Sequence, residues 1–244
     1  MTVSIVPLRM AAEIRAGDDL AALLLGCGEV LVDGDVVCVT HKAIAKAEGR
    51  IARLGEIEPS HYARTIAGEH GDPRHIELVL RESTRIVRQR RALVIAETRQ
   101  GMVCANAGLD RSNTAGHDEV VLLPLDPDAS AAGLRAALEE RTGRRLAVVI
   151  ADTVGRAWRV GIVGTAIGAA GIAPVRDYAG TVDPNGYLLR ATTVAIADEV
   201  AAAADLVFGK VERVPAAIVR GVDLGDGEGG ASDLIREPGG DLFR

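Results

Sequence analysis

The chain has 244 residues, of which 48% are apolar, and a formal net charge of -6. This length and apolar content are sufficient for one large domain or two small domains with a sizeable core. Because only 2% of the residues are aromatic and acidic side chains outnumber basic ones, a nucleic-acid-binding surface is not expected.

The amino-terminal segment and the cysteines indicate in which cellular compartment the protein is expected. Residues 1–10 lack the basic and apolar regions of a signal peptide, and no window approaches the roughly 20 apolar residues that a membrane span requires. The cysteines Cys27, Cys38 and Cys104 form neither a CxxC pair nor a cluster with histidine. The sequence therefore predicts a cytoplasmic protein without disulfides, without a zinc site and without a membrane partner.

The first clear strand is predicted over residues 30–40, where an Asp-Gly-Asp turn precedes a β-branched run. The segment after it carries the basic residues His41, Lys42, Lys46 and Arg50. Cations and free backbone N–H groups at a strand end can hold phosphates. The spacing of four residues between the last three cations is equally typical of one solvated helix face.

Helices and two short strands are predicted next. Residues 59–90 combine apolar residues at helical spacing with many charges, which predicts a pair of solvated helices. Strands follow over residues 92–96 and 101–105. A loop of small residues, 106–110, closes the second strand and brings the chain to Asp110.

The clearest buried strand lies in the second half of the chain. A helix capped by Ser130 is predicted to run to about Arg141. The consecutive aliphatic residues at 146–151 then imply a strand that is buried on both faces and delivers Asp152 and Thr153 to its end.

Glycines form a regular stripe after this strand. Their spacing of three, four and three residues predicts one face of a helix that permits close packing or the approach of a ligand. They do not form the G-x-G-x-x-G fingerprint of dinucleotide-binding folds. These glycines are Gly161, Gly164, Gly168 and Gly171.

The last predicted elements are an Ala-rich helix over residues 194–208 and a short strand over 216–219. Between them, Gly209 and Lys210 are followed by a valine, which excludes a P-loop. The Gly- and Asp-rich tail, about 222–244, is expected to be flexible. Strands mixed with helices and no clear linker indicate an α+β (mixed α/β) chain that forms one unit over its full length.

Two acidic positions follow predicted strands, Asp110 and the pair Asp152-Thr153. Carboxylates at neighbouring strand ends can share a hard divalent cation and leave coordination positions for phosphate oxygens. Aspartate is also common in turns and helix caps, because it satisfies local backbone donors. The pattern alone leaves both interpretations open.

Two guanidinium groups follow directly, Arg156 and Arg159, and such groups bind carboxylates or phosphates bidentately. Trp158, the only tryptophan, is expected in the core. Four of the histidines match no metal-ligand spacing and are expected at the surface. They are His61, His70, His75 and His117.

Six blocks of sequence occur together in an order that is typical of one known family. They are Gly17-Asp18-Asp19-Leu20, Lys46-Ala47-Glu48-Gly49-Arg50, Asn106-Ala107-Gly108-Leu109-Asp110 with Ser112-Asn113, Leu123-Pro124 with Asp126-Pro127-Asp128, Asp152-Thr153-Val154-Gly155-Arg156, and Ala197-Asp198-Glu199. Through these blocks, which span roughly residues 17–221, the chain resembles the coenzyme F-420:L-glutamate ligase family, also called F-420 γ-glutamyl ligase. Such a combination is more specific than any single motif.

The resemblance implies an enzyme of coenzyme F-420 biosynthesis. Such an enzyme uses GTP to join L-glutamate to a carboxylate of the F-420 precursor and then extends the product by γ-linkage. It also implies Mn²⁺ or Mg²⁺, two ions per site, with K⁺ as a further candidate ion. By the same resemblance, Asp110, Asp152 and Thr153 match metal positions, and Lys46 and Asn113 match nucleotide-binding positions.

Further segments fall where this family lines its nucleotide site, namely 11–14, His41-Lys42 and 207–214, which includes Gly209 and Lys210. Relatives usually carry small hydroxyl residues in the loop that here contains His41. The resemblance also implies two interleaved domains and an intertwined homodimer with the nucleotide groove near its interface. The flavin-dependent reductase domain that follows the ligase in some relatives is not expected in this chain.

The family chemistry and the acidic loops together predict a mechanism. The acceptor carboxylate attacks the γ-phosphate of GTP, and the amine of glutamate captures the resulting acyl phosphate. In this hypothesis Asp110 and Asp152 act with the metal ions, and Arg156 and Arg159 orient carboxylates. The alternatives are a metal-dependent phosphotransferase or nucleotidyltransferase with another acceptor, and a non-catalytic nucleotide-binding module.

Overall fold

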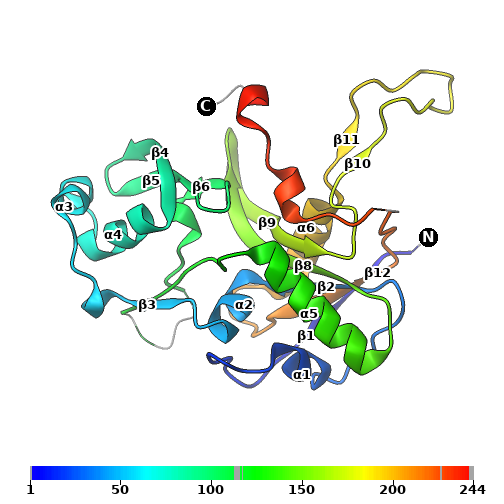
Figure 1. Cartoon of the computed structure of the whole chain (residues 1–244), viewed down its shortest axis with the longest axis horizontal. Coiled ribbons are helices and arrows are strands. Elements are labelled where there is room, and N and C mark those ends of the chain that lie inside the picture. The colour runs from blue at the N-terminus through cyan, green and yellow to red at the C-terminus, as the bar shows by residue number, and fades with distance from the viewer. Residues whose placement is uncertain (1, 113–115, 117, 226, 242–244) are drawn as a thin grey trace.

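A computed structural model describes residues 2–112, 116, 118–225 and 227–241. It contains a larger lobe built on a five-stranded sheet and a smaller lobe built on a three-stranded sheet (Figure 1). The mixture of helices and sheets confirms the α+β class. Among the described residues, no helix is long and apolar enough to cross a membrane.

The larger sheet has the strand order β1-β12-β2-β8-β9. Strands β2 and β8 are parallel, and the other neighbours are antiparallel. A parallel pair requires a crossover, and here the crossover contains α2, the whole smaller lobe and α5. The strands are β1 (Ser4–Leu8), β2 (Val36–Thr40), β8 (Ala147–Arg156), β9 (Arg159–Ala170) and β12 (Ala216–Arg220).

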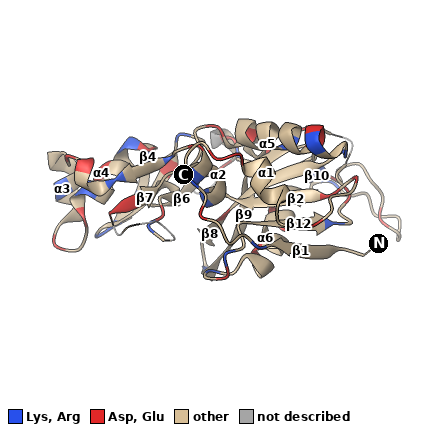
Figure 2. Ribbon diagram, turned by 90° about the horizontal axis from the view of Figure 1, so that it is seen from below, with Lys and Arg blue, Asp and Glu red and all other residues tan. Residues whose placement is uncertain are grey.

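Helices cover both faces of this sheet, which explains the continuous aliphatic runs of its central strands. In β2, Val37 and Val39 belong to the apolar cluster that includes α1 and α5, while Val36 and Cys38 belong to the cluster that includes α6. Figure 2 shows α5 on one side of the sheet and α6 on the other. The helices are α1 (Leu20–Leu25), α5 (Pro127–Thr142) and α6 (Ile196–Phe208).

The smaller lobe packs two helices against an antiparallel sheet. Its core contains Ile66, Ile76, Val79 and Val94. The lobe consists of α3 (His61–Ala67), α4 (Pro73–Arg81), β4 (Ser83–Arg90), β5 (Leu93–Thr98) and β6 (Val103–Ala105), and a ribbon of β3 (Ile51–Arg53) and β7 (Glu119–Val121) connects it to the larger lobe.

Short elements complete the chain. Helix α2 follows β2, and a small hairpin of β10 and β11 projects from the larger lobe (Figure 1). These elements are α2 (His41–Ala47), β10 (Arg176–Asp177), β11 (Thr193–Val194) and the 3-10 helices η1 (Leu54–Glu56), η2 (Asn106–Gly108), η3 (Ala231–Leu234) and η4 (Pro238–Gly240).

Several element predictions need correction. The helical pair expected over residues 59–90 ends at Arg81, because the residues from Ser83 onward pair with β5. Helix α5 is capped by Asp126, which accepts the Ala129 N–H, so the expected cap Ser130 lies inside the first turn. The predicted strands at 92–96, 101–105 and 216–219 are confirmed with small changes of their ends.

The glycine stripe lies in a strand and its flanking residues, and not in a helix. Strand β9 contains Gly161, Gly164 and Gly168, and Gly171 follows its end. The prediction of close packing holds, because a Cβ at Gly164 would come within 2.4 Å of the Ala201 carbonyl oxygen in α6. Strand β8 is also longer than expected, since it continues through Asp152 to pair with β9.

The carboxy-terminal segment contacts the larger lobe. Ala231 is 3% exposed and packs in the cluster beside α6. The Asp128 carboxylate at the start of α5 accepts the backbone N–H groups of Ala231 and Ser232. The expected flexibility of the tail and the division into interleaved domains stay predictions.

Candidate active site

A cavity of about 440 Å³ opens at the end of β2, beside the middle of β8. Because the two strands are parallel and Thr40 pairs with Ala151, the residues that follow β2 lie beside Asp152 and Thr153 of β8. The cavity is lined by residues after β1, by the start of α2, by the middle of β8 and by the loop after α6. It brings together His41, Lys42, Lys46, Asp152, Thr153, Gly209 and Lys210.

His41 and Asp152 form a buried pair in this cavity. Their side chains are 3% and 12% exposed, and Nδ1 of His41 lies 3.0 Å from Oδ1 of Asp152. The backbone N–H of Thr153 donates to the same oxygen. The Nε2 atom of His41 is buried and has no hydrogen-bond partner among the described residues. The Thr153 N–H bond and the close contact with His41 on this oxygen hold the Asp152 carboxylate in one orientation.

Lys42 and Asp110 form a second pair that joins the two lobes. The Lys42 ammonium lies 2.8 Å from Oδ2 of Asp110 and donates to the Ser112 hydroxyl at 2.6 Å. Burial raises the pKa of Asp110, but the bonds from Lys42 and from the Ser112 N–H outweigh it, so the net pKa lies below the usual value. Asp110 is therefore an ionised carboxylate at neutral pH.

These residues fit a divalent cation. Consecutive residues of α2, His41 and Lys42, bond to Asp152 and Asp110, so the two carboxylates converge at the start of one helix. The described residues contain no group of three His, Cys, Asp or Glu side chains placed to hold an ion. A site for Mg²⁺ needs only one or two carboxylates, because waters and substrate phosphates supply the other oxygens. The donors present suit that mode of binding.

Lys46 also lines the cavity, so the alternative of a solvated helix face does not apply to it. Lys46 is 9% exposed and pairs with Glu13, in the segment after β1. Arg50 lies beyond the helix end, where it bonds to the Leu123 carbonyl and to Glu82. The basic residues of this segment therefore serve the cavity and the junction between the lobes.

The loop after α6 forms the opposite wall. Gly209 has a φ of +61°, and a Cβ there would overlap the Glu212 carboxylate. This carboxylate accepts the backbone N–H groups of Lys210 and Val211. Gly209 is therefore needed for the turn that presents Lys210 to the cavity.

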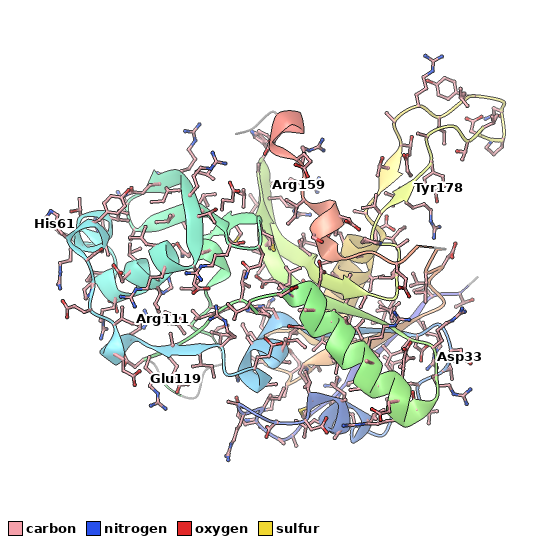
Figure 3. All side chains as sticks on the ribbon, in the orientation of Figure 1. Asp33, His61, Arg111, Glu119, Arg159 and Tyr178 are labelled. Atoms are coloured by element: carbon pink, nitrogen blue, oxygen red, sulfur yellow. The ribbon has the colours of Figure 1, made fainter. Side chains whose placement is uncertain are left out.

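Other predicted site residues lie elsewhere. Arg156 and Arg159 are exposed at the tip of the β8–β9 hairpin, which Figure 3 shows projecting from the sheet with Arg159 labelled. Trp158 is 83% exposed at the same tip, so the expectation of a core position is wrong. Asn113 and His117 lie outside the described residues. The role of the two arginines stays a prediction.

The remaining histidines divide into two groups. His61 and His70 are exposed, as predicted. His75 is partly buried in α4, and burial lowers its pKa, with a further lowering by Arg111 and an opposing effect of Asp72. Its Nδ1 has no hydrogen-bond partner among the described residues. The expectation that His75 lies at the surface is therefore wrong.

One cavity residue, Asp205, was not predicted from the sequence. It lies on α6 and lines the cavity beside Gly164. In the sequence, an aspartate of an Ala-rich helix that faces a cavity looks the same as one that faces solvent. Its position depends on the packing of α6 against β9, which local spacing does not reveal.

Comparison with known proteins gives a consistent result. A family model described as F420-0:Gamma-glutamyl ligase matches residues 9–221. The chain is 44% identical over 254 residues to the coenzyme F420:L-glutamate ligase of Methanothermobacter thermautotrophicus, with all of both chains covered. It is 45% identical over 249 residues to the ligase of the same name from Methanopyrus kandleri, with 100% of this chain and 98% of the relative covered. The chain is also 40% identical over 246 residues to the coenzyme F420:L-glutamate ligase of Archaeoglobus fulgidus, with 100% of this chain and 97% of the relative covered.

Proposed function

Since the chain belongs to the F420-0:gamma-glutamyl ligase family, we propose that it ligates L-glutamate to the coenzyme F420 precursor with the use of GTP. The observation that carries this proposal is that His41 and Lys42, consecutive residues of α2 that line the cavity, pair with the carboxylates of Asp152 and Asp110. The names of the relatives support the F420 precursor as the acceptor and L-glutamate as the amino acid that is added. The lysines of the cavity support a nucleoside triphosphate as the phosphate donor.

The triphosphate is proposed to lie along the cationic wall of the cavity. The ammonium groups of Lys42 and Lys46 neutralise phosphate oxygens there. Asp110, Asp152 and Thr153 hold Mn²⁺ or Mg²⁺, two ions in our proposal, with K⁺ as a further candidate. When bound, the divalent ions supply charge neutralisation for the transferred phosphoryl group.

The reaction proceeds in two proposed steps. A carboxylate oxygen of the acceptor attacks the γ-phosphorus, an O–P bond forms, and the bond to the GDP oxygen breaks. The amine of glutamate then attacks the acyl carbon, a C–N bond forms, and phosphate leaves. His41 fixes the orientation of Asp152 through both steps and is therefore a positioning residue.

We also propose that the chain forms a homodimer. The β8–β9 hairpin presents large apolar side chains to solvent, at Trp158, Val160 and Ile162. Adjacent exposed apolar residues of this kind are typical of protein interfaces. The same hairpin carries Arg156 and Arg159, so a second copy could receive these arginines near its own cavity.

The proposal is tested by product analysis. The purified protein is incubated with GTP, Mn²⁺, L-glutamate and the glutamate-free F420 precursor, beside an Asp152→Ala control. We expect the precursor mass to increase by whole glutamyl units, with release of GDP, in the wild type only. Release of GDP without an amide product would favour a phosphotransferase, GTP cleaved to the monophosphate would favour a nucleotidyltransferase, and bound GTP without turnover would favour a binding module.

A further inference from the structure

The cavity contains a carboxylate that binding of a nucleotide does not explain. Asp205 lines it with a side chain that is 21% exposed. A triphosphate repels a nearby carboxylate unless that carboxylate has a positive partner or a hydrogen-bond donor. The ammonium of Lys210 lies 3.8 Å from Asp205, and Lys210 is 62% exposed, so this pair is loose.

The other carboxylates of the cavity have closer partners. Asp152 is bonded to His41, and Glu13 is bonded to Lys46. Asp205 is therefore the cavity carboxylate best placed to accept hydrogen bonds from a ligand.

The packing of α6 places Asp205 beside the part of the cavity that contains Thr153. Gly164 pairs with Thr153 across β8 and β9, and a Cβ at Gly164 would come 3.0 Å from the Cβ of Asp205. Asp205 is therefore next to the β9 residue that pairs with Thr153, a metal ligand in the proposed function.

We propose that Asp205 binds the ammonium group of the amino-acid co-substrate and holds its nitrogen for attack on the acyl phosphate. This inference rests on the proposed function. A free amino acid is a zwitterion, and the loose Asp205–Lys210 pair offers one opposite charge to each of its ends. The ammonium binds to Asp205, and a carboxylate of the amino acid lies toward Lys210.

The proton balance also suits a carboxylate at this position. The ammonium must lose one proton before its nitrogen can attack, and the nitrogen loses a second proton as the C–O bond to phosphate breaks. The first proton passes to Asp205 and from there to solvent, and the departing phosphate takes the second. A carboxylate beside the nitrogen therefore serves both binding and the first proton transfer.

The first test is Asp205→Asn, which preserves the shape of the side chain and removes its charge. We expect kcat/KM for L-glutamate to fall about 10- to 150-fold, the ratio that corresponds to one hydrogen bond to a charged group. The Kd for GTP should change less than about twofold, because the carboxylate does not bind the nucleotide. The matched control is Asp33→Asn, at an exposed aspartate of the larger lobe, which should leave both constants unchanged.

The second test replaces glutamate with hydroxylamine, which is unprotonated at neutral pH and needs no ammonium site. It captures the acyl phosphate as a hydroxamate, and Asp205→Asn should form this product at the wild-type rate. The inference is overturned if the variant keeps the wild-type kcat/KM for glutamate, or if it loses hydroxamate formation to the same degree. If the wild type forms no hydroxamate, the acyl phosphate of the proposed function fails, and the inference fails with it.

Discussion

His41 is the residue through which the helix after β2 controls the site. Its imidazole is almost fully buried, and Nδ1 lies 3.0 Å from Oδ1 of Asp152. Residues that orient a metal-binding carboxylate commonly change affinity or activity by about 10- to 100-fold when removed. Under the proposed function, the side chain would therefore act on the chemistry through Asp152.

We predict that His41→Ala lowers kcat/KM for ligation by about 10- to 100-fold and raises the Mn²⁺ concentration that gives half-maximal activity. The matched control is His75→Ala, in the smaller lobe, which removes a histidine whose buried Nδ1 has no hydrogen-bond partner within the described part of the chain. The control should keep the wild-type metal requirement. Steady-state kinetics over a Mn²⁺ titration separate the two variants, and an equal loss in both would refute the positioning role.

Asp198 gives a prediction about stability. Burial raises the pKa of Asp198, although the Ala166 N–H bond to its carboxylate opposes this rise. A raised folded-state pKa means that ionisation of Asp198 destabilises the folded chain above that pKa. This penalty disappears below the unfolded value of about 3.9, where both states are protonated.

Asp198→Asn should therefore increase the free energy of unfolding near neutral pH, since the amide oxygen can still accept the Ala166 N–H. The gain should shrink as the pH falls through the folded-state pKa and vanish below about 3.9. Urea unfolding of both proteins over this pH range measures the difference. A gain that persists at the acid end would show that a neutral packing effect, and not ionisation, is responsible.

At the scale of elements, β9 depends on small residues because backbones approach it closely. A Cβ at Gly168 would lie 2.3 Å from the Pro127 carbonyl oxygen at the start of α5. On the other face, a Cβ at Gly164 would meet α6. The strand is thus confined between two helices, which also fixes the position of Asp205.

Gly168→Ala is predicted to destabilise the fold by about 1–3 kcal/mol, the usual effect of overpacking. The matched control is Gly133→Ala in α5, where an added Cβ would meet nothing within 4 Å. That change should stabilise the chain by about 0.5–1 kcal/mol, because alanine favours the helix. The midpoint temperature of thermal unfolding should therefore fall in Gly168→Ala and rise in Gly133→Ala. A shift of both variants in the same direction would contradict this account.

The sequence predicted an element well where a local run of apolar residues marked it. It predicted an element poorly where the structure depends on contact with a segment that is distant in the sequence. The aliphatic run before Asp152 identified β8, but its end was misplaced because the pairing of residues 152–156 depends on β9. The glycines of β9 suggested a helix, since a spacing of three and four residues does not reveal which backbone approaches. Local patterns carry no information about such partners.

The candidate site followed the same rule. The family resemblance assigned His41, Lys42, Lys46 and Asp152 to one site, and the structure places all four around one cavity. Asp205 had no local signal, because only the contact of α6 with β9 directs it inward. Lys42 and Ser112 are 70 residues apart, and their contact follows from the insertion of the smaller lobe.

At the scale of the whole molecule, the site is shared between the lobes. Asp110 comes from the smaller lobe and Asp152 from the larger sheet, and the start of α2 holds both. Arg50 reinforces this arrangement with bonds to Leu123 and Glu82. The relative position of the two lobes therefore sets the distance between the two carboxylates.

The exposed tip of the β8–β9 hairpin gives the last prediction. We expect the native mass in solution to be twice the chain mass of 25.5 kDa. The double variant Trp158→Ser, Val160→Ser removes apolar area from the tip and should shift the mass toward one chain. Val30→Ser, at an exposed valine outside the hairpin, is the matched control and should stay dimeric. Light scattering coupled to size-exclusion chromatography measures all three proteins.

The same variants decide how the arginines of the hairpin act. If Arg159 orients a carboxylate in the cavity of the partner, Arg159→Ala raises the KM for glutamate in the dimer. In the monomeric double variant, the further change Arg159→Ala should then have no effect on KM, because the arginine no longer reaches any cavity. A wild type that is monomeric would refute the dimer, whereas a dimeric double variant would place the interface on another surface. An unchanged KM in the dimer would leave Lys210 and Asp205 as the residues that bind the amino acid.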